Sequence, residues 1–100
     1  MLELRDTEHG KLISSRELHN KISVSHNSLK YMRWTRLHIH GIALKGKDYF
    51  EGHYIKTRAG LVPDILISVE LARSLCLMTK TKPSLRIREW LFEYELTCIS

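Results

Sequence analysis

The sequence predicts a small α+β domain, in which four helices and a few short antiparallel strands follow the approximate order ββααββαα. Its 100 residues, 43% hydrophobic and 27% charged, are typical of one globular domain. Short apolar runs flank glycines in two parts of the chain, as they do in β-hairpins. Serines that suit helix N-caps stand directly before two helix-like segments. We therefore expect residues 1–100 to form a single domain.

The first three elements are predicted from local signals near the N-terminus. Apolar residues on either side of a turn at Gly10 predict two brief strands within residues 2–13. A helix is expected over about residues 15–22, because Ser14 suits the N-cap position. Glu17 stands three residues after this cap, where a carboxylate can reach back to the backbone of the cap residue.

A second helix is expected over about residues 28–40, after a polar turn over residues 23–28. The two helices and their turn resemble a helix-turn-helix unit, whose second helix can lie in the major groove of DNA. On a helical wheel the apolar residues that share one arc are Leu29, Met32, Leu37 and Ile39. Arg33 and Arg36 interrupt this arc and Trp34 lies outside it, so the expected buried face is not continuous.

The second half of the chain predicts two more strands and two more helices. The strands are expected over residues 49–58 and 64–67, on either side of a loop that contains Gly60. Ser68 then suits the N-cap of an apolar helix that ends near Met78. Pro83 is typical of the opening turn of a helix, and this last helix is expected to end near Leu96.

The chain is expected to act in the cytoplasm, without a membrane partner. Its first residues lack the basic start and apolar run of a signal peptide, and no stretch approaches the roughly 18 apolar residues of a membrane span. Cys76 and Cys98 lie in apolar, helix-like stretches, where a free cysteine usually behaves as a small buried hydrophobic residue.

The charge pattern predicts an anionic partner. The net charge is +5, and no acidic residue stands between Glu17 and Asp48. Within this window the residues expected to contact DNA are Lys30, Arg33, Arg36, Lys45 and Lys47. Tyr31 and Trp34 lie among these cations and suit either stacking on bases or packing in the core, of which packing is favoured.

A second group of cations stands at the start of the last helix. These residues are Lys80, Lys82, Arg86 and Arg88, and acidic residues follow only later in the helix. A helix N-terminus favours anions, so cations there suggest that a phosphate is held at this place. The alternative is that Arg86 pairs with Glu89 along the helix, or that these are solvated surface charges.

The sequence contains no pattern that indicates catalysis or a cofactor. It has no glycine-rich phosphate loop, no nucleophile elbow and no evident pair of catalytic carboxylates. His38, His40 and Cys76 do not have the spacing of a structural zinc site. We therefore expect a protein that is not an enzyme and that needs neither cofactor nor metal.

Four segments of the chain resemble the AntA/AntB family of phage antirepressor domains. Ser15–His19 is similar to the family's opening "ARELH" segment, and Lys47–Phe50 to its central "xDF" segment. Asp64–Ala72 and Arg86–Glu95 are similar to its "LTLDMAKELA" and "RRYFIExE" stretches. The resemblance covers roughly residues 12–96. It implies a regulatory module of phage or prophage proteins, of a kind grouped loosely with other viral modules that include DNA-binding ones.

Together these observations predict a DNA-binding transcriptional regulator of a phage or mobile element, acting as a repressor. It would contact DNA through both groups of cations, and a homodimer would match palindromic half-sites. The alternative, implied by the family name, is an antirepressor that binds and inactivates a repressor protein without contacting DNA. A third reading is a module that only mediates oligomerisation, its charge serving solubility.

Overall fold

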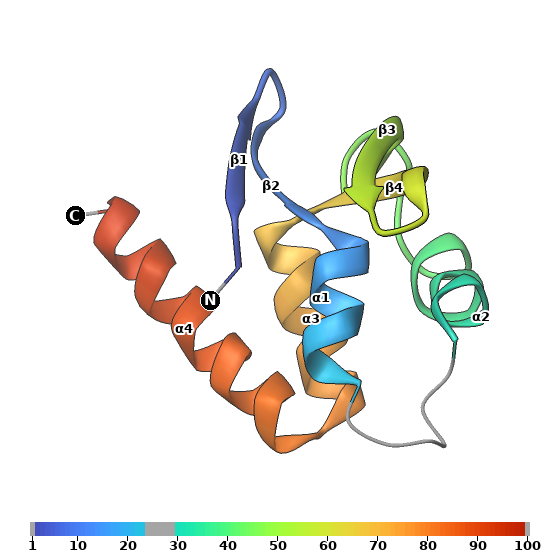
Figure 1. Cartoon of the computed structure of the whole chain (residues 1–100). Coiled ribbons are helices and arrows are strands. Elements are labelled where there is room, and N and C mark those ends of the chain that lie inside the picture. Colours follow the sequence, from blue (N-terminus) through green and yellow to red (C-terminus); the bar gives the residue numbers. More distant parts are fainter. Residues whose placement is uncertain (1, 24–29, 100) are drawn as a thin grey trace.

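The computed structural model describes residues 2–23 and 30–99, with side chains described as far as residue 94. It confirms the predicted α+β class and element order (Figure 1). The strands are β1 (Leu4–Thr7), β2 (Gly10–Ser14), β3 (Tyr49–Thr57) and β4 (Gly60–Ser68). The helices are α1 (Ser15–Ile22), α2 (Tyr31–Thr35), the π-helical segment η1 (Arg36–His40), α3 (Val69–Thr79) and α4 (Lys82–Ile99).

The four strands form one antiparallel sheet in the order β1-β2-β4-β3. Each outer pair is a hairpin, and β2 joins the two hairpins by pairing with β4. Both hairpins turn at a glycine in the left-handed region, with φ of 94° at Gly10 and 101° at Gly60. Glycine adopts this conformation without the steric cost that a Cβ atom brings. The glycine signals in the sequence therefore located both turns.

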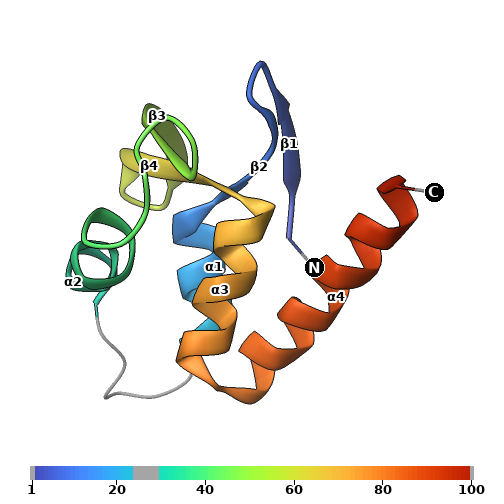
Figure 2. The same cartoon turned by 180° about the vertical axis from the view of Figure 1, so that it is seen from behind.

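Helices α1 and α3 stand together below the sheet, with α4 on one side of them and α2 on the other. Figures 1 and 2 show this arrangement from opposite directions. The core lies where the sheet meets these helices, and its largest fully buried apolar side chains include Leu12, Ile13, Leu18, Ile22, Leu66, Ile67, Leu75 and Leu91. No helix in the described part of the chain is long and apolar enough to cross a membrane.

The helix starts confirm the predicted serine caps. The Ser14 and Ser68 hydroxyls accept hydrogen bonds from the backbone N–H groups of Glu17 and Leu71, respectively. The side chain of Glu17 takes a different partner from the expected one, because its Oε1 accepts from the N–H of Glu3 at 2.9 Å. Glu3 precedes the β1–β2 ladder, so its N–H has no strand partner. Glu17 therefore joins the start of β1 to α1.

The start of α4 carries a cap that the sequence reading missed. Thr81 Oγ1 accepts from the N–H of Ser84 at 3.2 Å, and Ser84 Oγ accepts from the N–H of Thr81 at 2.8 Å. Pro83 lies in the opening turn, as predicted. The Thr81 hydroxyl also donates to the carbonyl of Ile22, which links the end of α1 to the start of α4.

The predicted apolar arc of the second helix is right for Ile39 and wrong for Met32 and Leu37. Met32 and Leu37 are 64% and 50% exposed, whereas Trp34 and Ile39 are 5% and 0% exposed. The helix changes from α to π geometry at Arg36, and the wider π turn brings residues five apart closer to one face. Trp34 and Ile39 are five apart, so a wheel drawn for a uniform α-helix puts Ile39 on the apolar arc and leaves Trp34 outside it, although both are buried. Residues 24–29, which contain the predicted turn and Leu29, lie outside the described residues, so the helix-turn-helix unit stays a prediction.

Cys76 is fully buried in α3, as expected for a structural cysteine. Burial raises the pKa of its thiol to about 11. In a Cys98→Ser variant, which leaves Cys76 as the sole thiol, we expect the native protein to react with Ellman's reagent far more slowly than the urea-unfolded chain. Because the pKa of Cys76 lies above the range from pH 7 to 9, the native rate should rise about tenfold per pH unit there, whereas the rate of the unfolded chain, with an ordinary thiol pKa of about 8.5, should level off. A native rate equal to the unfolded rate would contradict the burial of Cys76.

Candidate nucleic-acid interface

A buried carboxylate, that of Asp64, ties β4 to the start of α1. Asp64 is 3% exposed, and its Oδ2 accepts a hydrogen bond of 2.5 Å from the hydroxyl of Ser14. Its Oδ1 accepts from the N–H of Arg16 at 3.3 Å and from its neighbour Ile65 at 2.9 Å. A carboxylate at the N-terminus of a helix is stabilised by free N–H groups and by the helix dipole. Asp64 therefore fixes the position of α1 on the sheet.

The same cluster extends from α1 to α2. The hydroxyl of Ser15 lies 2.7 Å from that of Tyr31 and 3.4 Å from Asp64 Oδ1. Burial raises the pKa of Tyr31, so this phenol remains protonated well above neutral pH. A chain of polar contacts thus runs from β4 through α1 to the first residue of α2.

Arg16 brings three elements together at this place. Its guanidinium carbon lies 4.1 Å from the centre of the Tyr31 ring, within the range of a cation–π contact. Its Nε donates a hydrogen bond to the carbonyl of Pro63 in β4. Arg16 in α1 therefore contacts both α2 and the β3–β4 hairpin, and it fixes their relative position.

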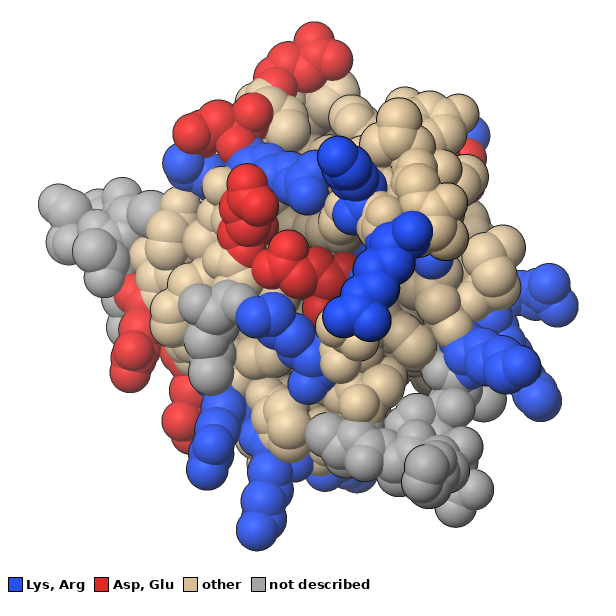
Figure 3. Space-filling model, in the orientation of Figure 1, with Lys and Arg blue, Asp and Glu red and all other residues tan. Residues whose placement is uncertain are grey.

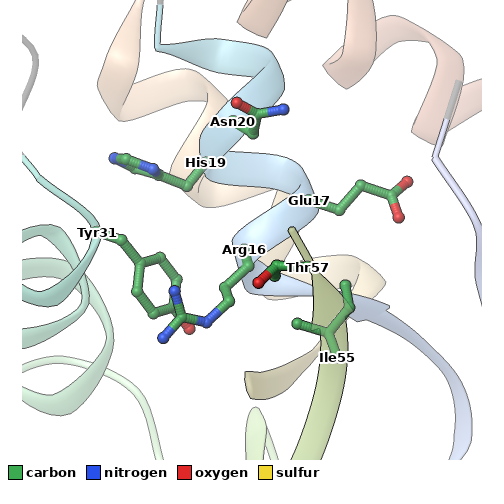
Figure 4. A pocket seen from close by; sticks show the side chains of 7 residues that line it. All are labelled: Arg16, Glu17, His19, Asn20, Tyr31, Ile55 and Thr57. Carbon is green, nitrogen blue, oxygen red and sulfur yellow. The ribbon is translucent and has the colours of Figure 1, made fainter. Parts of the chain in front are cut away.

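Two hollows lie on either side of the Arg16–Tyr31 contact, between the helices and the β3–β4 hairpin. The larger has a volume of about 410 Å³, and Figure 4 shows the side chains that line it: Arg16, Glu17, His19, Asn20, Tyr31, Ile55 and Thr57. In that view Glu17 points away from Arg16. The smaller hollow, of about 220 Å³, reaches Met32 and Thr35 in α2 and Glu51 in β3. The hairpin and α2 therefore form the walls of one grooved surface.

Trp34 anchors α2 on α1, in agreement with the expectation that it packs in the core. Its ring lies 5.0 Å from that of His19 in α1 and 6.3 Å from that of Tyr31. Tyr31 is itself partly buried against the core. Because the inner face of α2 is held in this way, its outer face is presented at a defined position.

The cations of the first predicted group lie on the surface of this part of the molecule. Lys30 precedes α2 as its N-cap residue, Arg33 lies in α2, Arg36 begins η1, and Lys47 lies in the loop before β3. All four are exposed. Among the described residues, Arg33 and Arg36 have no acidic partner within ion-pair distance.

Lys45 differs from the rest of this group. Its Nζ lies 3.0 Å from Glu51 Oε2, and this contact raises the pKa of Lys45. Glu51 Oε1 also lies 3.9 Å from Nδ1 of His40. The window that is free of acids in the sequence is therefore not free of them in space, because β3 carries Glu51 back to it. The pair is exposed, so it holds Lys45 only weakly.

The second predicted group lies elsewhere. Lys80 is the C-cap residue of α3 and has a left-handed conformation, with φ of 56°, and Lys82 is the first residue of α4. Arg86 is exposed on α4 and forms no ion pair with Glu89 in the part of the chain that the structure describes. Arg88 is half-buried, with its guanidinium 4.7 Å from the centre of the Phe92 ring.

The structure does not bring the two predicted groups together on one face. Helices α1 and α3 separate α4 from α2 in both views of the chain. In Figure 3 lysine and arginine side chains lie at the right margin, where α2 lies in this view, at the lower margin and over the middle of this face, whereas the acidic side chains lie toward its top and left. The elements that carry the two predicted groups of cations therefore lie on different sides of α1 and α3, and contact of both groups with one DNA duplex stays a prediction.

Three basic residues on α1 and the β3–β4 hairpin were not among the predicted contacts. They are Arg16 in α1, Lys56 in β3 and Arg58 in the turn that follows. Arg16 stands between a cap serine and Glu17, and its sequence neighbours give no sign that it meets Tyr31. Lys56 and Arg58 are close in the sequence and both stand just before the predicted turn at Gly60, which was a usable signal.

Within residues 2–23 and 30–99, no group of three or more histidine, cysteine or acidic side chains is placed to hold a metal ion. Comparisons of the chain with models of protein families, with curated proteins and with solved structures find no match.

Proposed function

We propose that the protein is a DNA-binding regulator of phage or prophage genes, which acts in the bacterial cytoplasm and contacts duplex DNA through the outer face of α2 and η1. The observation that supports this most is the position of Arg33 and Arg36. They stand three residues apart, and on a helix this spacing places both on one side. That side is opposite the buried Trp34 and Thr35, so both guanidinium groups face solvent from an anchored helix.

The chemistry of this face suits the major groove. Arginine binds the O6 and N7 atoms of guanine with two hydrogen bonds, and exposed lysines such as Lys30 and Lys47 suit phosphates. Met32 and Leu37 flank the arginines and are exposed, which suits contact with thymine methyl groups. A two-fold dimer would place two copies of α2 on successive half-sites of a palindrome. The AntA/AntB resemblance supports the phage context.

Two cations of α4, Lys82 and Arg86, provide the control for the test of this proposal. Lys82 and Arg86 belong to α4, which lies on the other side of α1 and α3 from α2, so a duplex held by α2 does not need them. Replacing them removes the same charge as replacing Arg33 and Arg36. The comparison therefore separates a contact made at α2 from an effect of net charge.

The test is a fluorescence anisotropy titration with a labelled duplex from the promoter next to the gene and with a scrambled duplex of equal length, at two salt concentrations. We expect the wild-type protein to prefer the promoter and to bind it more weakly at higher salt. The Arg33→Ala/Arg36→Ala variant should lose about 30-fold or more in promoter affinity, since each specific arginine contact contributes about 1–3 kcal/mol. The Lys82→Ala/Arg86→Ala variant should lose much less. Absence of binding by the wild-type protein to any duplex from the element would exclude this function.

An antirepressor that binds a repressor protein is the second candidate, and one observation favours it. Four large apolar side chains are exposed along α2, η1 and the loop that follows, namely Met32, Leu37, Ile42 and Leu44. Exposed apolar patches often mark protein interfaces. In this case the repressor encoded by the same element should co-purify with the protein, and Met32→Ser/Leu37→Ser should abolish the complex while the chain shows no DNA affinity.

A further inference from the structure

The two β-hairpins have the same turn but carry opposite charge at the tip. In the β1–β2 turn, Thr7 Oγ1 donates to the carbonyl of Gly10 at 2.9 Å and accepts from the N–H of His9 at 3.1 Å. In the β3–β4 turn, Thr57 Oγ1 forms the same two bonds, to the carbonyl of Gly60 at 3.0 Å and from the N–H of Ala59 at 3.2 Å. The second residue of the turn is acidic in the first hairpin, Glu8, and basic in the second, Arg58.

The charges of the β1–β2 hairpin are paired. Lys11 Nζ lies 2.5 Å from Asp6 Oδ1, and Nε2 of His9 lies 3.3 Å from Glu8 Oε1. The ring of His9 also stacks on that of Phe50 in β3, with the ring centres 4.2 Å apart. This tip is therefore attached to the body of the protein, and its turn presents the acidic Glu8 and not a cation.

The cations of the β3–β4 hairpin are free to meet an external anion. Lys56 and Arg58 are exposed and have no acidic partner among the described residues. The acids on the hairpin strands have other partners, because Glu51 pairs with Lys45 and Asp64 is buried among hydroxyl and N–H groups. Tyr54 is 63% exposed and lies on the same face as Lys56, since residues two apart on a strand share a face.

The hairpin is bent and held beside α2. The pairing of β3 with β4 shifts register between Phe50 and His53, and Gly52 within this bulge has φ of 87°. A bulge bends its strand and increases the local twist. Figures 1 and 2 both show the β3–β4 hairpin next to α2. The contacts of Arg16 with Tyr31 and Pro63 then fix the angle between hairpin and helix.

We infer that the β3–β4 hairpin is a second DNA-contacting element, in which Lys56 and Arg58 bind the phosphate backbone beside the groove that receives α2. This inference rests on the proposed function and adds a place of contact to it. In this arrangement the helix contacts bases and supplies specificity, whereas the basic hairpin contacts phosphates and supplies affinity. Phosphate contacts add the same affinity to every sequence, so loss of the hairpin contact should weaken promoter and scrambled duplexes alike.

The shared turn allows a test by exchange of charge. Three variants are compared with the wild-type protein: Arg58→Glu, Glu8→Arg, and the double variant with both changes, which restores the net charge of +5. We expect Arg58→Glu to weaken binding to both duplexes by about tenfold or more and to reduce the slope of log affinity against log salt by about 0.9. Glu8→Arg should stay within about threefold of the wild-type affinity, since its hairpin lies away from α2. The double variant should behave like Arg58→Glu.

The outcomes separate this inference from the proposed function. If the wild-type protein binds the promoter and Arg58→Glu binds equally well, the hairpin contact is wrong and the role of α2 stands. If the double variant regains wild-type affinity, net charge and not the position of Arg58 governs binding, which also overturns the inference. If the wild-type protein binds no duplex, both fail together. Thermal unfolding of each variant confirms that the exchanges, made at exposed turn positions, leave the fold intact.

Discussion

Replacement of Trp34 by alanine is expected to lower the free energy of unfolding by about 3–5 kcal/mol, the usual cost of truncating a buried aromatic side chain. Trp34 is 5% exposed and contacts His19 in α1 and Tyr31 in α2. Its loss leaves a cavity between α2 and the core, which the short helix cannot close without moving. Urea unfolding followed by circular dichroism measures the effect.

The matched control is Met32→Ala, in the same helix. Met32 is a large apolar residue that is 64% exposed, so its truncation should change the free energy of unfolding by no more than about 0.5 kcal/mol. The pair of variants also distinguishes the structure from the helical-wheel prediction, which placed Met32 on the shared apolar arc and Trp34 outside it. A larger loss for Met32→Ala than for Trp34→Ala would reverse the assignment of the buried face.

Replacement of Asp64 by alanine is expected to cost about 2–4 kcal/mol of stability, because it leaves several buried hydrogen-bonding groups without their acceptor. These are the hydroxyls of Ser14 and Ser15 and the N–H of Arg16. The substitution also removes the carboxylate that interacts with the start of α1. Equilibrium unfolding in urea gives the loss.

Two further variants make the result for Asp64 specific. Asp6→Ala removes an exposed carboxylate that pairs with Lys11, and it should cost no more than about 1 kcal/mol. In a double-mutant cycle, Ser15→Ala should cost less in the Asp64→Ala background than in the wild-type protein, because the two side chains contact each other. Equal costs in both backgrounds would show that Ser15 and Asp64 act independently.

Much of the secondary structure was predictable because its signals are local. The caps at Ser14 and Ser68 join atoms only three residues apart, and the hairpin turn at Gly60 depends on the conformation of one glycine. Such signals are complete within a short stretch of sequence. The predicted bounds of α1 therefore agree with the structure, and the predicted α3 ends within one residue of the observed end.

The candidate site was predictable only in part. Arg33 and Arg36 are exposed, as a contact with DNA requires. The helical wheel did not predict that Trp34 is buried on the opposite side of the helix, or that Met32 and Leu37 are exposed. The π turn at η1 changes which residues point inward, and the sequence of residues 36–40 contains no signal that predicts a π turn. Asp64 was noted only as part of a strand and a family-like segment, although its role is to bind groups about 50 residues earlier in the chain.

The sequence by itself determined that this is a small basic α+β domain, because composition, caps and turns are properties of the chain and its near neighbours. The tertiary structure alone decided which cations share a surface. Lys45 meets Glu51 only because β3 returns past the preceding loop, and α4 lies away from α2 because α1 and α3 pack between them. Charges act through space and not along the chain, and only the tertiary structure shows that the two predicted groups of cations lie on different sides of α1 and α3 and that the β3–β4 hairpin lies beside α2.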